Sequence, residues 1–469
     1  MKKFIRYTFL LVAGATVFAG CKKYLNINTD PNNPLVVPES VTIPAVEVTL
    51  GTNVVGGFAG TTVNYWMQVI SLNQSLPTQE NYFIQPTDVD NTWSFFVYPN
   101  ILENLQVMIK QSEAAKHTQY AAIGFAIQAY SLAITTDLWG DVPWSQALQL
   151  PAIVKPKYDP QQQVYGDIQA LLDSALFYIA ATPSQIAPGG DDYIYGGDMD
   201  AWAKWIHMMK ARYYLRLSNA PGRTAATQAD SALAQLALGF GSNDDNAVMS
   251  YPTQDGSPWY ENTDPAAGGV VMSKTFIDLL QGNADPRLPI LATKAPQGPN
   301  AGTYIGRPPG SDTVFGSYKD FSLVNDAYND INAPLYMATY SEQLFIQAEA
   351  TFITQGAAAA DPIYRAAIKA HMDMVGVAAG AETTYLATRP ALTAGTALQS
   401  IITEKYIAGF LGLEPYNDYR RTGFPALTPT VNGLTPYIPK RWPYAKGEIL
   451  TNPQPQDSVT LGSPVWWAQ

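Results

Sequence analysis

The sequence predicts a mainly α-helical protein in which tetratricopeptide-like helix pairs form an α–α superhelix and long irregular segments carry the binding surface. Periodic apolar segments come in pairs, and each helix–loop–helix unit spans roughly 34–40 residues, a length typical of such repeats. Ala and Gly stand where paired helices would cross. Between the pairs the chain is rich in Gly, Pro, Asn, Asp and Tyr, and its 35 Gly and 35 Pro indicate long ordered loops.

The first set of predicted helices lies in the first half of the chain. In the middle segment, Asp159 is the predicted N-cap and Gln162 completes a capping box, after which one apolar stripe follows. The segment before it is almost entirely apolar or small, which predicts a buried helix and not a membrane span. The three segments are 119–136, 159–181 and 199–218.

A second set of predicted helices comes late in the chain. Its first member starts with a second capping box, Thr339 and Glu342, and its second member opens with Asp-Pro. The three segments are 339–353, 361–377 and 397–412. The predicted helical scaffold therefore covers roughly residues 100–240 and 335–425.

Two stretches, roughly residues 51–100 and 241–335, show little periodicity and contain many turn-forming residues. Long irregular segments on a regular scaffold are where binding residues usually lie. We therefore expect the binding surface on these two loop-rich stretches.

The N-terminus predicts export and a lipid anchor. A positively charged start is followed by an uncharged run at 9–19, too short to span a bilayer, and by Ala-Gly before Cys21, the single cysteine of the chain. Small residues directly before a cysteine resemble a bacterial lipobox. We expect residues 1–20 to be a lipoprotein signal peptide, 21–38 a tether lipidated at Cys21, and 39–469 a single domain. The alternative is an ordinary signal peptide with an incidental cysteine.

The composition narrows the class of ligand. The formal net charge of −11 argues against nucleic-acid binding, which needs clustered Lys and Arg. Charged residues make up only 14% of the chain and aromatic residues 12%. A surface with few charges and many Tyr and Trp suits neutral, hydroxyl-covered ligands, although core packing would also use many of these rings.

The chain lacks the common catalytic motifs, so we expect no enzyme activity and no catalytic residue. The sequence shows no HExxH, GxSxG, Walker A or GxGxxG pattern. A pair of carboxylates for glycoside hydrolysis stays open, because only their separation in space would reveal it. The three isolated histidines are expected to be structural: His117, His207 and His371.

We expect no cofactor and no metal ligand. A structural calcium ion stays open as an alternative, because residues 244–246 and 326–332 offer Asp and Asn oxygens in loops. Neither stretch has the spacing of an EF-hand.

Six stretches, taken in their order along the chain, resemble motifs of the SusD/RagB family of outer-membrane nutrient-binding lipoproteins. The resemblance is strongest to the SusD-like branch of that family. Arg420 and Arg421, in one of these motifs, follow a helix and are expected to pair with its last carbonyls or with buried acids. The matching stretches are LNINTDPNNP (25–34), TDLWGDVPWS (136–145), KARYYLRLS (210–218), YSEQLFIQAEA (340–350), EKYIAGFLGLEPYNDYRRTGFP (404–425) and PKRWPYAKGEILTN (439–452). Lys22 and Lys23 depart from the acidic signal that often follows the cysteine in surface-exported relatives.

The resemblance implies a function. A member of this family captures an oligosaccharide or another nutrient and passes it to a SusC-like TonB-dependent barrel. It is lipid-anchored in the outer membrane and faces the cell exterior. Two alternatives remain: the same fold and partner with a peptide cargo, or an α-helical glycosidase.

The candidate ligand-binding residues are aromatic residues with polar neighbours in the two loop-rich stretches. Flat aromatic rings stack on the apolar faces of sugar rings, and amides, carboxylates and guanidinium groups bind the hydroxyls. Helical aromatics such as Trp202, Trp205 and Tyr213 are expected in the core. The candidates are Asn64, Tyr65, Trp66, Tyr82, Trp93, Trp259, Tyr260, Tyr304 and Arg307.

Overall fold

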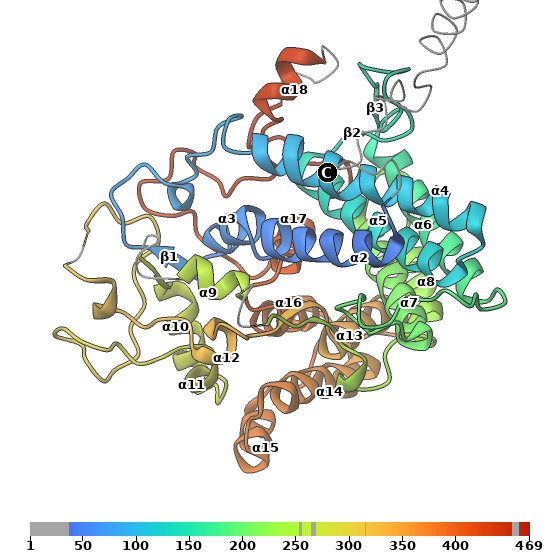
Figure 1. The fold of residues 1–469 in the computed structure, drawn as a ribbon. Helices are drawn as coiled ribbons and strands as arrows, with labels where there is room; N and C mark the ends of the chain where they lie inside the picture. Colours follow the sequence, from blue (N-terminus) through green and yellow to red (C-terminus); the bar gives the residue numbers. More distant parts are fainter. Residues whose placement is uncertain (1–36, 253–255, 264–268, 315, 453–458) are drawn as a thin grey trace, which may run out of the picture.

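The protein is mainly helical, as the sequence predicts, and its helix pairs surround one large apolar core (Figure 1). The computed structural model describes residues 37–252, 256–263, 269–314, 316–452 and 459–469. The predicted signal peptide, Cys21 and most of the predicted tether lie outside the described residues.

The first described elements form a layer across the middle of the molecule (Figure 1). Residues 51–66 and 90–100 are mostly helical, so the prediction of an irregular segment is wrong there, whereas residues 67–89 hold only short elements. Glycines and Pro99 suggest breaks in this stretch, but its apolar residues pack on all sides and the backbone stays helical, partly as π-helix. The elements are α2 (Glu39–Val48), η1 (Thr49–Val55), α3 (Phe58–Trp66), β1 (Ile70–Leu72), η2 (Gln79–Asn81) and η3 (Thr92–Glu103).

The first set of predicted helices is confirmed, and α5 packs against both α4 and α6 while α7 packs against α8. The predicted capping box at Asp159 is wrong, because Asp159 accepts bonds from the backbone N–H groups of Trp144 and Ser145 instead. Asp141 Oδ1 accepts the N–H of Gln161 at 2.8 Å in its place. The elements are α4 (Asn104–Ala115), α5 (Thr118–Trp139), β2 (Val142–Pro143), β3 (Tyr158–Asp159), α6 (Gln161–Ile179), α7 (Met199–Arg216), η4 (Leu217–Asn219) and α8 (Ala225–Leu236).

The second loop-rich stretch holds only short elements and lies on the opposite side of the layer from α6–α8 (Figure 1). Two antiparallel ribbons tie it to the scaffold: Ile70 of β1 pairs with Met272 of β5, and Val248 of β4 pairs with Tyr336 of β6. The elements are η5 (Asn243–Asp245), β4 (Ala247–Met249), α9 (Pro258–Thr263), β5 (Val270–Met272), α10 (Lys274–Gly282), α11 (Leu288–Leu291), η6 (Tyr318–Asp320), α12 (Asp326–Asn329) and β6 (Leu335–Ala338).

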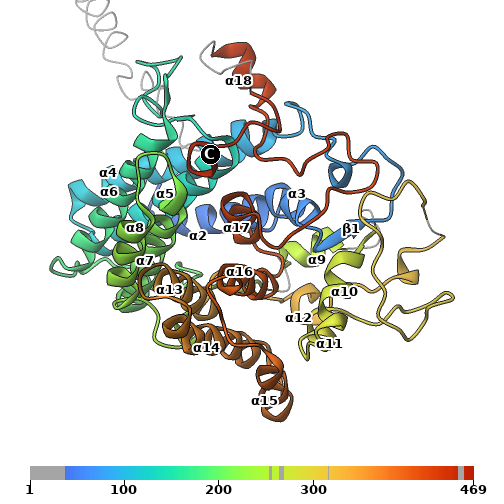
Figure 2. The ribbon, with the colours of Figure 1, turned by 180° about the vertical axis from the view of Figure 1, so that it is seen from behind.

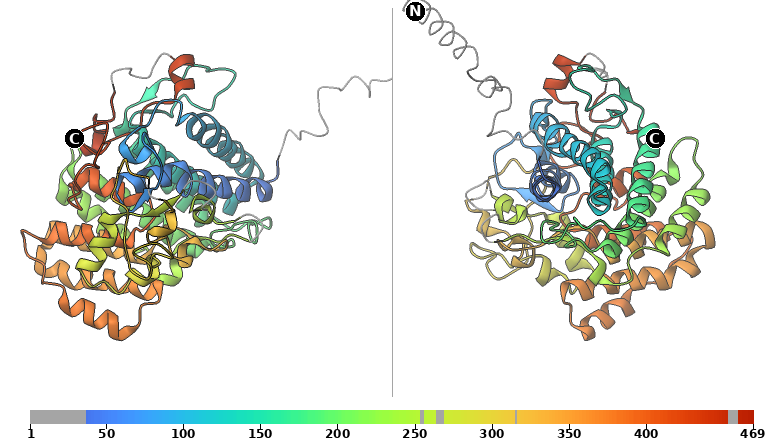
Figure 3. Two further views of the ribbon diagram at one scale, coloured as in Figure 1. Left: turned by 90° about the vertical axis from the view of Figure 1, so that its left-hand side faces the viewer. Right: turned by 45° about the vertical axis from the view of Figure 1, so that its right-hand side comes forward.

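The second set of helices is also confirmed, and α14 and α15 lie at the end of the molecule that is far from α18 (Figures 1 and 3). Thr339 caps α13, accepting the N–H of Glu342 at 3.1 Å, while the Glu342 carboxylate pairs with Arg212 at 2.7 Å. Helix α13 packs against α14, α8 and α16, and so joins the two sets. The elements are α13 (Tyr340–Gln355), α14 (Ala357–Val375), α15 (Ala379–Thr388), α16 (Ala397–Ala408) and α17 (Glu414–Thr422).

The C-terminal segment returns across the molecule and completes the core. It contains α18 (Lys446–Thr451) and η7 (Trp466–Ala468), and η7 contacts α6 and α17. Trp442 and Trp467 are completely buried, and Trp467 Nε1 donates to Asp137 Oδ1 at 2.9 Å. Residues from both ends of the chain therefore share one core.

Two helical stretches of the described chain are long and apolar enough to cross a membrane by length and composition alone. Thr118–Trp139 is 94% buried inside the protein, as expected for a core helix. Glu39–Trp66 is 50% buried and runs through α2, η1 and α3. Both pack within the fold, so neither needs a membrane to cover its apolar surface.

Candidate functional site

A surface hollow beside α3 brings the two loop-rich stretches together. We call it the α3 groove; its volume is about 210 Å³. Its lining combines two aromatic rings with three side-chain amides and contains no charged residue among those the structure describes. The lining residues are Phe58, Thr61, Thr62, Tyr65, Leu72, Gln74, Gln79, Asn262 and Val270.

One wall of the α3 groove depends on the close approach of α9 to the start of α3. A Cβ atom at Gly56 would lie 2.4 Å from Pro258 Cγ, so a larger residue there would push α9 away. The side-chain amide of Asn262 donates to the carbonyl oxygen of Gly56. Asn262 is thus fixed at the groove edge although its helix lies far along the chain from α3.

The opposite wall, the segment from β1 to η2, is held by a buried ion pair. Arg307 Nη1 lies 3.0 Å from Glu80 Oε2, and both side chains are fully buried. Ser71 donates to the other oxygen of Glu80. Burial raises the pKa of Glu80 despite the opposing effects of the Ser71 hydrogen bond and of the Arg307 charge. The backbone oxygen of Gln79 also accepts from Trp66 Nε1 at 3.0 Å, which orients the Gln79 segment over α3.

The groove suits a neutral ligand that carries both apolar faces and hydroxyl groups. Phe58 is half-buried and offers apolar surface, Tyr65 lines the groove although it is only 5% exposed, and the three amides offer both donors and acceptors. Burial, followed by the nearby Glu80 charge, raises the pKa of Tyr65, so its hydroxyl stays protonated and neutral. Sites of this kind combine apolar walls with a few placed polar groups.

Of the sequence-predicted binding residues, only Tyr65 lines the α3 groove. The expectation of open aromatic faces at most of the other positions is wrong, because those side chains complete the core. Trp66 packs on Tyr416, and Trp93 packs on Trp139 with their ring centroids 5.1 Å apart. The fully or almost fully buried candidates are Asn64, Trp66, Tyr82, Trp93, Trp259 and Arg307.

Two candidates keep exposed surface outside the groove lining. Tyr260 is 41% exposed on α9, two positions from Asn262 and so on the other side of that helix. Tyr304 is half-buried beneath Lys294, whose Nζ lies 5.8 Å from the ring centroid. Trp202, Trp205 and Tyr213 are in the core, as predicted.

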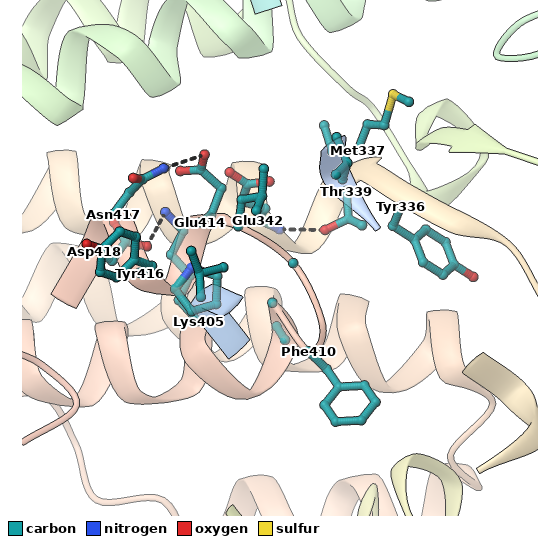
Figure 4. A pocket seen from close by; sticks show the side chains of 18 of the residues that line it. Tyr336, Met337, Thr339, Glu342, Lys405, Phe410, Glu414, Tyr416, Asn417 and Asp418 are labelled. Carbon is teal, nitrogen blue, oxygen red and sulfur yellow. Dashed lines mark hydrogen bonds and ion pairs between the residues drawn. The ribbon is translucent and has the colours of Figure 1, made fainter. Parts of the chain in front are cut away.

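A second pocket lies beside α16 and α17 and has a volume of only about 70 Å³ (Figure 4). This is room for a few water molecules and is too small for a sugar ring. Its charged residues have partners within the scaffold: Lys405 lies 2.9 Å from Asp418 (Figure 4), and Glu414 pairs with Arg216 of α7. This α16–α17 pocket is therefore part of the scaffold.

The two arginines of the predicted helix-end motif take different roles. Arg421 pairs with Glu349 and Asp418, as expected for a buried arginine. Arg420 donates to the carbonyl oxygens of Asp137 and Lys440.

The acidic loops considered for calcium have other partners. Asp245 pairs with Lys204 at 2.7 Å and accepts the N–H of Gly241, while Asp330 accepts the N–H of Asn332. Within the described residues there is no group of three or more His, Cys, Asp or Glu side chains placed to hold a metal ion. The three histidines are also far apart: His117 pairs with Glu39, His207 contacts Gln235, and His371 lies against Arg287.

Comparisons with known proteins agree with the helical architecture. A chitin-binding protein is 25% identical with a TM-score of 0.79 over 92% of this chain and all of that chain. A SusD/RagB family protein from Bacteroides thetaiotaomicron is 22% identical with a TM-score of 0.75 over 92% of this chain and 99% of its own. A chitin-binding SusD homologue from Flavobacterium johnsoniae is 21% identical with a TM-score of 0.75 over 92% and 98%. The comparison with curated proteins gave no match.

The family model described as "Starch-binding associating with outer membrane" matches residues 31–445. This match spans both sets of helix pairs and all of the residues that line the α3 groove. The chain therefore belongs to the SusD-like family.

Proposed function

We propose that this protein is a non-catalytic, lipid-anchored glycan-binding protein of the outer membrane that captures oligosaccharides in the α3 groove. It delivers them to a SusC-like TonB-dependent transporter. The observation that carries the glycan assignment is the groove lining, in which Phe58 and Tyr65 lie beside the amides of Gln74, Gln79 and Asn262. Starch is named in the family description, and one structural relative at 25% identity binds chitin.

The chemistry of the groove supports binding without hydrolysis. Glycoside hydrolysis uses two carboxyl groups roughly 5–9.5 Å apart on either side of the scissile bond. The described residues that line the groove include no Asp or Glu. The release of reducing ends from an oligosaccharide by the purified protein would contradict this assignment.

Titration calorimetry with malto- and chito-oligosaccharides tests the glycan site. In Gln79→Ala the backbone oxygen that binds Trp66 remains, so the variant removes only the side-chain amide from the groove. We expect its dissociation constant to rise about tenfold, the value of roughly one hydrogen bond. Gln162→Ala is the matched control, because Gln162 is exposed on α6 and outside the groove.

The same titrations, repeated with peptides, decide between a saccharide and a peptide as the cargo. The family description and the named relatives favour saccharides over peptides. Binding of mixed peptides, with no heat from any saccharide, would overturn the glycan assignment. If Gln79→Ala and wild type bind the best saccharide with equal affinity, the α3 groove is not the saccharide site.

The anchor and the partner need tests in the native membrane. Cys21→Ser should release the full-length protein from the outer-membrane fraction. Two or three acyl chains anchor a protein stably, and a serine at this position would carry none. A TonB-dependent barrel should co-purify with the wild-type protein after mild solubilisation. Retention of Cys21→Ser on the membrane, or purification without any barrel, would contradict the respective part of the proposal.

A further inference from the structure

A third hollow is lined by residues from the C-terminal part of the chain and has a volume of about 420 Å³. We call it the C-terminal groove. Its lining comes from the end of α17, the loop that follows and the last turn of the chain. Figure 2 shows α17 and the C-terminus from this side of the molecule. Its lining residues are Tyr419, Arg420, Gly423, Pro429, Pro436, Tyr437, Ile438, Lys440 and Ala468, none of which lines the α3 groove.

The C-terminal groove differs from the rest of the protein in its charge. Its described lining contains the cations Arg420 and Lys440 and no carboxylate, whereas the whole chain has 39 acidic and 28 basic residues. None of the ion pairs within the described ranges involves either cation, although the neighbouring Arg421 is paired with both Glu349 and Asp418. The groove is therefore a local positive site on an acidic protein.

The guanidinium of Arg420 is held in place by uncharged groups and makes no direct ion pair among the described residues, although the Asp137 carboxylate is near enough to interact with it electrostatically. It lies over the rings of Tyr416, 4.0 Å from the centroid, and Trp467, 4.6 Å from the centroid. Nη1 donates to the carbonyl oxygens of Asp137 and Lys440, and Nη2 donates to Asn417 Oδ1. The second N–H of Nη2 has no partner among these bonds. A fixed guanidinium loses little entropy when it binds a planar anion.

The walls of the groove suit a ring. Tyr419 and Tyr437 are half-buried, so part of each phenol faces the outside. Pro429 and Pro436 add rigid apolar surface, and the exposed Lys440 stands at the edge as a second donor. A volume of about 420 Å³ lies within the range of small-molecule sites, roughly 300–1,000 Å³.

We propose that the C-terminal groove is a second saccharide subsite that binds a sugar carrying a carboxylate, as in a uronic acid residue. Arg420 and Lys440 bind the carboxylate by charge-assisted hydrogen bonds, and the tyrosine and proline walls hold the ring. Because the protein as a whole is acidic, an acidic glycan would be repelled elsewhere on the surface, and a cationic groove provides the local attraction. The site goes beyond the neutral-glycan site of the α3 groove and is independent of it.

Calorimetry with trigalacturonate, its methyl ester and a neutral chito-oligosaccharide tests the inference on the full folded chain. Wild type should bind the free acid at low salt at least tenfold more tightly than the methyl ester, which has the same rings without the charges. Lys440→Gln should weaken binding of the acid about tenfold and leave the neutral ligand unchanged. Lys446→Gln removes the same charge from an exposed position on α18 and should stay within twofold of wild type.

A second variant separates geometry from charge. Arg420→Lys keeps the positive charge but loses the planar guanidinium, so it should also weaken binding of the acid. Its thermal unfolding midpoint shows whether the variant folds. Equal binding of acid and ester, or equal effects of Lys440→Gln and Lys446→Gln, would overturn the inference. Neutral binding without acid binding would refute this subsite alone, and acid binding without neutral binding would refute the α3 groove alone.

Discussion

The helix-pair scaffold and the α3 groove use polar side chains in opposite ways. In the scaffold, charges are buried and paired: Arg421 contacts Glu349 and Asp418, and Lys405 lies 2.9 Å from Asp418. In the groove the polar residues are uncharged amides at the surface. The comparison shows that paired motif residues such as Arg421 and Lys405 stabilise the fold, whereas the neutral ligand is expected at residues of the α3 groove, which belong to no motif.

The largest expected effect comes from breaking the buried charges. Arg421→Ala leaves the buried Glu349 without its ion-pair partner and Asp418 with Lys405 alone, and should lower the free energy of unfolding by up to about 5 kcal/mol. Urea unfolding measures this change. Lys274→Ala, which removes an exposed i,i+4 pair with Asp278, is the control and should cost at most about 1 kcal/mol. Similar costs for both variants would show that burial of the charges is unimportant.

Two neighbours on α9 sharpen the comparison within the loop-rich stretch. Trp259 is 2% exposed and Tyr260 is 41% exposed. Trp259→Ala should lower the free energy of unfolding by about 3–4 kcal/mol, because it empties a core position, while Tyr260→Ala should change it by at most about 0.5 kcal/mol. If Trp259→Ala instead abolished saccharide binding without loss of stability, Trp259 would be a ligand contact after all.

Acid should weaken the scaffold through Asp418. Burial alone would raise its pKa, but Lys405 and Arg421 together outweigh burial and lower it from 3.8 to about 2. Because the folded-state pKa lies below the ordinary value, ionised Asp418 stabilises the protein above about pH 4, and this contribution, about 2 kcal/mol, is lost as the pH falls to about 2. The free energy of unfolding, measured between about pH 4 and 2, should therefore fall less in Asp418→Asn than in wild type. A variant with an unchanged profile would contradict the assigned pairing.

The smallest expected effect is on saccharide affinity in the α3 groove. Phe58→Leu keeps apolar volume but removes the flat ring, so saccharide affinity should fall several-fold, about 1 kcal/mol, in calorimetry. Phe177→Leu, at an exposed position on α6, is the matched control and should bind like wild type. An affinity that is the same in both variants would exclude ring stacking on Phe58.

The sequence predicts the scaffold well because helices depend on local patterns. The apolar periodicity places α5, α6, α7, α13 and α16 close to their observed bounds. The groove depends on contacts between distant segments, which no local pattern shows: Asn262 reaches Gly56, and Arg307 reaches Glu80. For the same reason Trp66 and Trp93 resemble exposed loop aromatics in the sequence, whereas they are buried against Tyr416 and Trp139.

A crystal structure with a bound neutral oligosaccharide, chitotriose or maltotriose, tests the central claim most directly. We predict one sugar ring over Phe58, with hydroxyls bonded to the amides of Gln79 and Asn262. A sugar bound only at other aromatics, such as Tyr260 or Tyr304, with an empty α3 groove would contradict the account.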